Sequence, residues 1–335
     1  MTRQLTPNIK ITVQHGDALR IAADVLVLKY ANALFGADRA VVHAIEDAGQ
    51  EIRDRLPKPS GFYITSVRGI LAANQVIFIG VGPLRQFEYK QIRAFSRRAL
   101  SALAGESPEA KHVVLTAHGP GYGLDEAEAF MSEIAGLIEA INSEDFPIAL
   151  KKITIAEANP GRAKRFIRFL DQFLTEKDMF AGSHLDDYAM HAQPRGVPQS
   201  AGYNSERKPR IFVAMPFAEE MEDVFHYGIQ GAANAAGFLC ERADLSSFTG
   251  DIIQWVKNRI AKASLVIADL SDANPNVYLE VGYAWGCGRP TVLLVKDIGH
   301  LKFDVQGQRC LVYKTIKELE TALRKELGNL KELPF

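Results

Sequence analysis

The sequence has few cysteines, almost no net charge and no long hydrophobic run. Its three cysteines fit neither a metal site of paired cysteines nor a disulfide framework, so we expect reduced thiols in a cytoplasmic protein. A net charge of −1 over 335 residues gives no general attraction for nucleic acid. No apolar run approaches the length needed to cross a bilayer. These features leave a globular protein that recognises its partner through a local site.

Short apolar runs rich in valine and isoleucine alternate with amphipathic stretches along the chain. In the first half we expect strands at Ile9–Val13, Asp24–Leu28, Gln75–Ile79, His112–Thr116 and Lys152–Ile155. We expect helices at Asp38–Arg55, Tyr89–Leu103, Asp125–Ile141 and Arg162–Leu174. This alternation is typical of parallel strands joined by crossover helices, so the sequence predicts an α/β protein of three-layer α/β/α domains.

The pattern is interrupted by a stretch rich in glycine, proline, serine and charge. We therefore expect a first domain at residues 1–178, a linker at 179–208 and a second domain at 209–335, the alternative being an ordered loop across one large domain. Strands of the second domain are expected at Ile211–Ala214, Phe238–Glu241, Leu265–Ala268, Thr291–Val295 and Cys310–Tyr313. Its helices are expected at Glu219–Ala236, Asp251–Lys262, Asn276–Cys287 and Thr315–Leu327. Five strands in this alternation predict a small doubly wound sheet with flavodoxin-like strand order.

Ligands of an open parallel sheet bind at the carboxyl ends of its strands. In the second domain the candidate site residues at that edge are Met215, Pro216, Phe217, Arg242, Asp269, Ser271, Asn276, Glu280 and Tyr283. The neighbours of Glu280 make its helix apolar nearly all round, which predicts a buried helix. A carboxylate there is costly unless it is paired or used in chemistry. A structural ion pair of Glu280 with Arg242 or Arg289 is the alternative.

Five segments of the second domain resemble the bacterial TIR-like and nucleoside 2-deoxyribosyltransferase-like families: IFVAMPF, RAD at Arg242–Asp244, GDI at Gly250–Ile252, ADLSDANPNVYLEVGYAWGCGRP and KFD at Lys302–Asp304. The resemblance spans about Pro209 to Leu327. It implies cleavage of the N-glycosidic bond between a ribose C1′ and a base. It also implies that Glu280 is the nucleophile or the glutamate that contacts the ribose.

The residue types suit that chemistry. Departure of the base leaves an oxocarbenium-like sugar, which a carboxylate beneath C1′ can stabilise or trap as an ester. Asp269 could hold ribose hydroxyls or protonate the leaving base, although it could also only cap the loop after its strand. Ser271 and Asn276 could supply hydrogen bonds, and backbone N–H groups near Met215–Ala218 could receive a phosphate. Nicotinamide leaves NAD as a neutral base and needs no acid.

Two segments of the first domain, GDALRIAADVLVLKYAN and TAHGPGYGLDEAEAF, resemble a macro domain or the macro-like N-terminal domain of leucyl aminopeptidases. The resemblance implies a regulatory ligand such as an ADP-ribose derivative, bound by Asp17, Asn32, Gly119, Gly121, Tyr122 and Gly123. The glycine-rich loop that usually follows the asparagine is absent, because Gly36 stands alone in ALFGADRA. Hydrolysis of ADP-ribose linkages is therefore not expected, and a purely structural or dimerising domain is the alternative.

Together these features predict an N-glycosidase that acts on a nucleotide, with NAD as the first candidate and the macro-like domain gating the activity. Such pairings of a sensor with an NAD-consuming effector resemble bacterial antiphage systems. The alternatives are a non-catalytic nucleotide-sensing protein that assembles on ligand binding, and a nucleoside deoxyribosyltransferase or hydrolase of salvage. We expect a nucleotide ligand and a homo-oligomer. We expect no metal, no cofactor other than NAD as substrate, and neither nucleic acid nor membrane as a partner.

Overall fold

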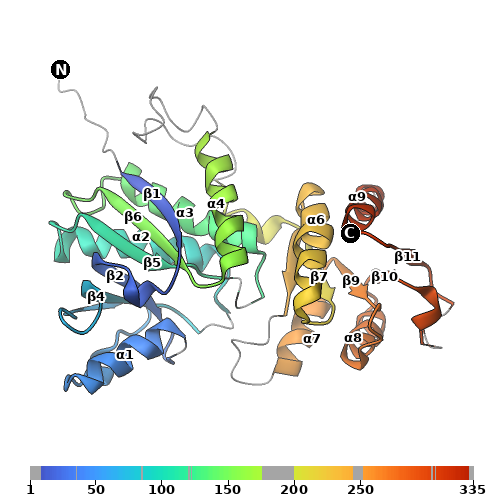
Figure 1. Ribbon diagram of the computed structural model, residues 1–335, viewed down its shortest axis with the longest axis horizontal. Coiled ribbons are helices and arrows are strands. Elements are labelled where there is room, and N and C mark those ends of the chain that lie inside the picture. The colour runs from blue at the N-terminus through green and yellow to red at the C-terminus, as the bar shows by residue number, and fades with distance from the viewer. Residues whose placement is uncertain are drawn as a thin grey trace. The chain divides into compact units, whose positions relative to one another are not determined.

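The computed structural model of the chain describes residues 9–331, except 35, 84–85, 120, 122, 176–199, 244–251, 303–304 and 306 (Figure 1). Most of the expected linker, Tyr122, and parts of the RAD, GDI and KFD segments therefore lie outside the described residues. The chain divides into two compact units. Unit 1 comprises Met1–Gly119 and Glu126–Tyr203, and unit 2 comprises Pro120–Asp125 and Asn204–Phe335.

Unit 1 is built on a six-stranded sheet in the order β1-β6-β5-β2-β4-β3. Its strands are β1 (Lys10–His15), β2 (Ala23–Tyr30), β3 (Phe62–Ser66), β4 (Ala73–Gly80), β5 (His112–Thr116) and β6 (Lys152–Glu157). All neighbours pair in parallel except β3, which is antiparallel to β4. Val25–Leu28 of the central β2 are buried on both faces, as expected for a parallel strand covered by helices on each side.

Helices cover both faces of this sheet: α1 (Ala37–Asp47), α2 (Tyr89–Glu106), α3 (Glu126–Asn142) and α4 (Pro160–Thr175). Val41, Val42 and Ile45 of α1 pack in one cluster with Leu26 and Leu28 of β2. The alternate residues of the strand point to the opposite face, where α2 and α3 contact each other. The predicted α/β/α layering of this half is confirmed.

Unit 2 has a five-stranded parallel sheet in the order β11-β10-β9-β7-β8. Its strands are β7 (Arg210–Ala214), β8 (Leu239–Arg242), β9 (Leu265–Asp269), β10 (Thr291–Val295) and β11 (Cys310–Val312). Read from β8, this is the flavodoxin-like order that the sequence predicts.

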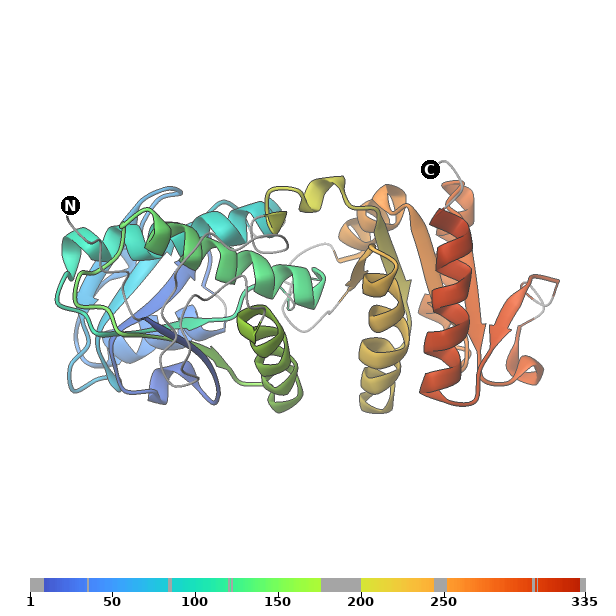
Figure 2. The same ribbon diagram turned by 90° about the horizontal axis from the view of Figure 1, so that it is seen from above.

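The helices of unit 2 lie on two faces of its sheet (Figure 2). They include η6 (Glu219–Met221), the π-helix η7 (Val224–Gln230), α6 (Gly231–Ala235), α7 (Ile252–Lys262), α8 (Pro275–Gly286) and α9 (Ile316–Lys331). Ile211 and Val213 of β7 pack in a cluster with residues of η7 and α9. Phe212 and Ala214, which alternate with them, pack in a second cluster with residues of α7 and α8.

Three details differ from the predictions. The strand β3 was not predicted, since its FYITS sequence ends in exposed residues at the sheet edge. The helix predicted at Asp38–Arg55 ends at Asp47, because Gly49 adopts a φ of 84° that a helix does not allow. The helix predicted at Glu219–Ala236 contains a 3₁₀ turn and a π-helix, and it ends at Gly237 as expected. Within the described ranges, no helix is long and apolar enough to cross a membrane.

Candidate functional site

A crevice is expected in unit 2 between the carboxyl ends of β7 and β9. These two strands are neighbours, but the helices that follow them lie on opposite faces of the sheet. Such a change of direction is the topological switch point, where open α/β sheets bind their ligands. The predicted residues Met215–Phe217 follow β7, and the helix α8 with Glu280 follows β9. The topology therefore brings these two parts of the predicted site to one edge.

The helix α8 starts where its sequence predicts. The side chain of Asn274 accepts a hydrogen bond from the backbone N–H of Asn276 at 2.9 Å, and Pro275 occupies the first helical position. Glu280 then lies about 8 Å along the helix axis from that start. The predicted Asn276 and Tyr283 lie four residues before it and three after it, on the same side of the helix.

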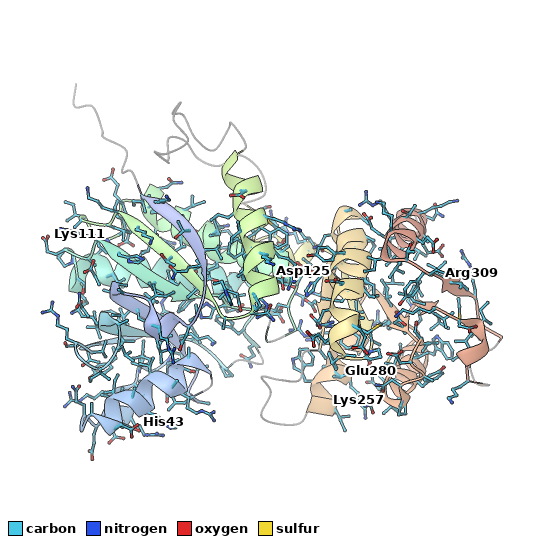
Figure 3. The ribbon with its side chains drawn as sticks, in the orientation of Figure 1. His43, Lys111, Asp125, Lys257, Glu280 and Arg309 are labelled. Atoms are coloured by element: carbon cyan, nitrogen blue, oxygen red, sulfur yellow. The ribbon has the colours of Figure 1, made fainter. Side chains whose placement is uncertain are left out.

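Glu280 is a half-buried carboxylate without a partner among the described residues. Burial alone raises its pKa from 4.5 to about 7. The alternative ion pairs do not form, since Arg242 binds Glu222 and, within the described part of the chain, no bond joins Glu280 to Arg289. Figure 3 labels Glu280 on α8 and Lys257 on the contacting helix α7. The Lys257 ammonium lies 5.6 Å from the ring centre of Tyr283.

The prediction that α8 is a buried helix is correct for only one of its faces. Only Val277, Val281 and Ala284 of this helix are buried, and they face the sheet. Leu279 is 68% exposed and Trp285 is 38% exposed, so the outward face of the helix is apolar but open to solvent. The raised pKa of Glu280 therefore comes from its local surroundings at the edge of the packed stripe, not from a helix enclosed on every side.

Asp269 is fully buried, and both of its carboxylate oxygens accept hydrogen bonds. Oδ1 accepts from the backbone N–H of Ser271 at 2.9 Å, and Oδ2 accepts from the hydroxyl of Tyr313 at 2.6 Å. The hydroxyl of Ser271 accepts in turn from the backbone N–H of Lys296 at 3.0 Å. Burial, followed by the Asp269 carboxylate, raises the pKa of Tyr313. This arrangement favours the alternative role of Asp269, which is to hold the loop that leads into α8.

Arg242 ends β8 on the other side of β7. Its Nη2 donates to Oε1 of Glu222 at 2.6 Å, and Nε2 of His226 lies 3.3 Å from the second oxygen of that carboxylate. The predicted Met215 is buried beside the guanidinium, with 4.0 Å between Nη1 and Sδ. The predicted Phe217 is 47% exposed, and its ring centre lies 5.5 Å from the guanidinium carbon.

The sequence analysis identified neither Glu222 nor His226 as a site residue. The signal available was their spacing of four residues, directly after the predicted Met215–Phe217 turn. The pairing itself depends on Arg242, which is 20 residues away in sequence and comes from another strand. Neither partner could be assigned without the topology.

In unit 1, three predicted ligand residues follow parallel strands and so lie at one edge of the sheet. Asp17 follows β1, Asn32 follows β2, and Gly119 follows β5, which pairs with β2. Asp17 accepts a hydrogen bond from the backbone N–H of Leu19 at 3.0 Å and caps a 3₁₀ turn. Asn32 has a φ of 57°, a left-handed conformation that asparagine tolerates.

The predicted phosphate loop continues at Gly121 and Gly123, which group with unit 2. A Cβ atom on Gly123 would lie 2.5 Å from the ring of Trp255 and 3.0 Å from the backbone oxygen of Arg242. Its φ of 77° also suits glycine. Asp125 accepts a hydrogen bond from the backbone N–H of Cys240 at 2.9 Å. Close packing within unit 2 therefore accounts for Gly123 without a ligand.

A polar groove of about 510 Å³ lies at the opposite edge of the unit 1 sheet, near the strand starts at Asp24 and Gln75. None of the predicted site residues lines it. Asp24 accepts hydrogen bonds there from the backbone N–H groups of Lys111 and His112, at 2.8 and 2.9 Å. Figure 3 labels Lys111 at this end of the unit.

No protein-family model matches the chain, and a search of curated proteins gives no match. Solved structures do resemble parts of it. A macrodomain of Oceanobacillus iheyensis with MES bound is 18% identical, with a TM-score of 0.40 over 51% of this chain and 95% of that chain. A Trypanosoma brucei macrodomain in complex with ADP-ribose is 17% identical, with a TM-score of 0.40 over 48% of this chain and 68% of that chain. The Clostridium botulinum CMP N-glycosidase BcmB is 18% identical, with a TM-score of 0.31 over 35% of this chain and 98% of that chain. All three TM-scores lie below 0.5.

Proposed function

We propose that unit 2 cleaves the N-glycosidic bond of a nucleotide and that Glu280 lies beneath the anomeric carbon of the bound sugar. The observation that supports this is the environment of Glu280: a half-buried carboxylate at the switch point, with a pKa raised to about 7 and no partner among the described residues. An unpaired, desolvated carboxylate costs stability in the free protein. A developing positive charge on the sugar would supply the missing partner.

As the bond between C1′ and the base breaks, its electron pair leaves with the base and the sugar becomes oxocarbenium-like. The ionised Glu280 stabilises that charge or bonds to C1′, and water or a second acceptor then completes the exchange. Asp269 has both oxygens engaged and is not free to protonate a leaving base. This favours a base that leaves without a proton, and nicotinamide makes NAD the first candidate substrate.

We also propose that unit 1 binds an ADP-ribose-like nucleotide and sets the activity of unit 2. Support comes from Asp17, Asn32 and Gly119, which follow three parallel strands at the carboxyl edge of the sheet. Adding ADP-ribose should change the rate of base release by the full chain. Asn32→Gly should abolish this response, because glycine keeps the left-handed backbone and removes only the amide. An unchanged response in that variant would remove Asn32 from the regulatory site.

The test of the catalytic proposal is release of nicotinamide from NAD by the full chain, followed by chromatography. Glu280→Gln should lower the rate by on the order of 10³-fold, because it removes the charge under C1′ and keeps the shape. Glu206→Gln, an exposed residue of the same unit, is the matched control and should leave the rate unchanged. Equal activity of the Glu280→Gln variant and the wild-type protein would refute the role of Glu280.

The pH profile separates an ionised Glu280 from a protonated one. If the carboxylate acts, kcat/KM should rise about tenfold per pH unit below pH 7 and level off above it. A fall above pH 7 would assign Glu280 as an acid instead. If NAD gives no product, the same assay with nucleoside 5′-monophosphates and with deoxynucleosides plus a free base tests hydrolysis and base exchange. Binding without turnover of any of these substrates would favour a non-catalytic sensor.

A further inference from the structure

Glu222, His226 and Arg242 form a cluster beside the switch point that the reaction at Glu280 does not use. Glu222 Oε1 accepts from Nη2 of Arg242 at 2.6 Å, and Oε2 faces Nε2 of His226 at 3.3 Å. The other ring nitrogen of His226 lies 3.0 Å from the amide oxygen of Gln230. The guanidinium stacks on the ring of Phe225, 4.1 Å from its centre. Arg242 and His226 are therefore held by several contacts besides their contact with Glu222.

The three side chains differ sharply in exposure. The side chains of Arg242 and His226 are 9% and 6% exposed, whereas that of Glu222 is 43% exposed. The side chains of Arg242 and His226 are thus buried and held in place, and the carboxylate of Glu222 lies between them and the solvent. A buried guanidinium without an anion is costly, so some anion must occupy this position in the free protein.

A carboxylate and a phosphate present the same chemistry to this pocket. Both accept two parallel hydrogen bonds from a guanidinium, and a phosphate carries more charge and more acceptor oxygens. Glu222 lies just before η7, a π-helix, and π-helical turns occur frequently at functional sites. Glu222 can turn outward to solvent without disturbing the contacts that hold Arg242 and His226, because none of those contacts passes through it.

The location suits a sugar phosphate. Arg242 ends β8 on one side of β7, and α8 with Glu280 follows β9 on the other side. Two strand spacings separate β8 from β9, or about 10 Å. Arg242 and α8 therefore both border the carboxyl end of β7, at the edge of the sheet where the substrate is proposed to bind.

We propose that Arg242 and His226 form the subsite for the 5′-phosphate of the substrate and that Glu222 occupies this subsite until the phosphate displaces it. This names the substrate class as 5′-phosphorylated nucleotides rather than nucleosides, and in that respect it rests on the proposed function. Binding of an anion to the cluster does not depend on any turnover. Glu222 competes strongly for the site, because the hydrogen bond from His226 and the charge of Arg242 lower its pKa to about 2 despite burial.

If phosphate displaces Glu222, removing the Glu222 charge should tighten phosphate binding. If Glu222 has only a structural role, removing its charge should leave phosphate binding unchanged or weaken it. Inorganic phosphate is titrated into the full chain by calorimetry, with wild type, Glu222→Gln and Arg242→Gln compared. Glu222→Gln should bind phosphate at least tenfold more tightly than wild type, since the competing charge is gone. Arg242→Gln should lose phosphate binding. Glu220→Gln, an exposed neighbour outside the cluster, should bind as wild type does.

Unchanged or weaker phosphate binding by Glu222→Gln would overturn the proposal. Hydrogen exchange of the peptide covering η7 locates the bound anion, and protection elsewhere in the chain with none at η7 would also overturn it. Should Glu222→Gln fold poorly, Glu222→Asp keeps the charge but shortens its reach, and it should still bind phosphate more tightly than wild type. Absence of turnover with every nucleotide would refute the proposed function, while the phosphate titration would still decide the subsite.

Discussion

The buried Glu126 and Glu133 of unit 1 are paired, whereas the half-buried Glu280 of unit 2 has no partner among the described residues. In unit 1, Glu126 is paired with Arg165 at 2.5 and 2.9 Å, and Glu133 binds the backbone and ring of His118 at 3.1 and 3.2 Å. In unit 2, Glu280 is buried enough to raise its pKa to about 7 but has no described partner. A buried acid is therefore an indication of chemistry only when the fold leaves it unpaired.

The same contrast exists within unit 2. Glu241 is almost fully buried between Arg210 and Arg259, at 3.3 and 2.9 Å. Asp269 is fully buried, and hydrogen bonds reach both of its oxygens. The carboxylates of Glu241 and Asp269 therefore have structural roles beside the strands that carry them. The helix that carries Glu280 contains no lysine or arginine that could pair with it.

The largest effect on stability is expected at the paired acid of unit 1. Glu126→Ala leaves Arg165 partly buried without its bidentate carboxylate, and breaking such a pair costs about 3–5 kcal/mol. Hydrogen exchange followed by mass spectrometry should show faster exchange in β5, β6 and α3, and little change in unit 2. Glu46→Ala, which breaks an exposed pair with Arg53, is the control and should cause little change. Equal effects of the two variants would mean that burial does not set the strength of these pairs.

Replacing Glu280 is expected to stabilise the folded protein, whereas replacing Glu126 destabilises it. Its pKa lies above the usual 4.5, so the folded state keeps its proton between pH 4.5 and about 7 while the unfolded state has lost it. Stability therefore falls as pH rises through this window, and the full penalty, about 3 kcal/mol, is present above pH 7. Glu280→Gln should remove the penalty and stabilise unit 2 at pH 8, with no effect at pH 4.

Urea unfolding at both pH values, monitored by hydrogen exchange of α8 and β9, measures this change. Asp272→Asn, an exposed acid in the loop before the same helix, is the matched control. Destabilisation by Glu280→Gln at pH 8 would show that the carboxylate has a favourable partner, and the proposed site would lose its main support.

The sequence was sufficient for most of the fold because the buried strands are short apolar runs and the turns are marked by glycine. The runs at Val25–Leu28 and Leu265–Asp269 are buried almost completely. The alternation of such runs with helices was enough to predict the flavodoxin-like strand order of unit 2. The edge strand β3 escaped prediction, because half-exposed edge strands have no continuous apolar run. The π-helix η7 was not predicted either, because the segment was read as part of one continuous helix at Glu219–Ala236.

The site could be predicted only where its residues are close in sequence. Asn274, Asn276 and Glu280 lie on one capped helix, so their relation follows from helix geometry. The partners of Arg242 and of Asp269 come from other elements, 20 and 44 residues away, and no local pattern indicates them. Pairing across elements depends on the assembled sheet, and it distinguishes Glu280, which has no partner among the described residues, from the paired carboxylates of Glu222 and Asp269.

The smallest of the expected stability effects concerns Asp269, and it sharpens the contrast with Glu280. Tyr313→Phe removes the hydroxyl that donates to Oδ2 at 2.6 Å and leaves the ring in place. Loss of one hydrogen bond to a buried charge should cost about 1.5–3 kcal/mol. If Asp269 only holds the loop before α8, kcat for base release should stay within about twofold, because the Ser271 bond still holds that loop.

Tyr227→Phe, which alters a tyrosine that is 43% exposed, is the control for loss of a hydroxyl. Urea unfolding and the base-release assay are run on the same preparations. A large fall in kcat with unchanged stability would place Asp269 in the reaction rather than in the loop. The proton for the leaving base would then have a source, and bases that need protonation, such as purines, would become candidate leaving groups beside nicotinamide.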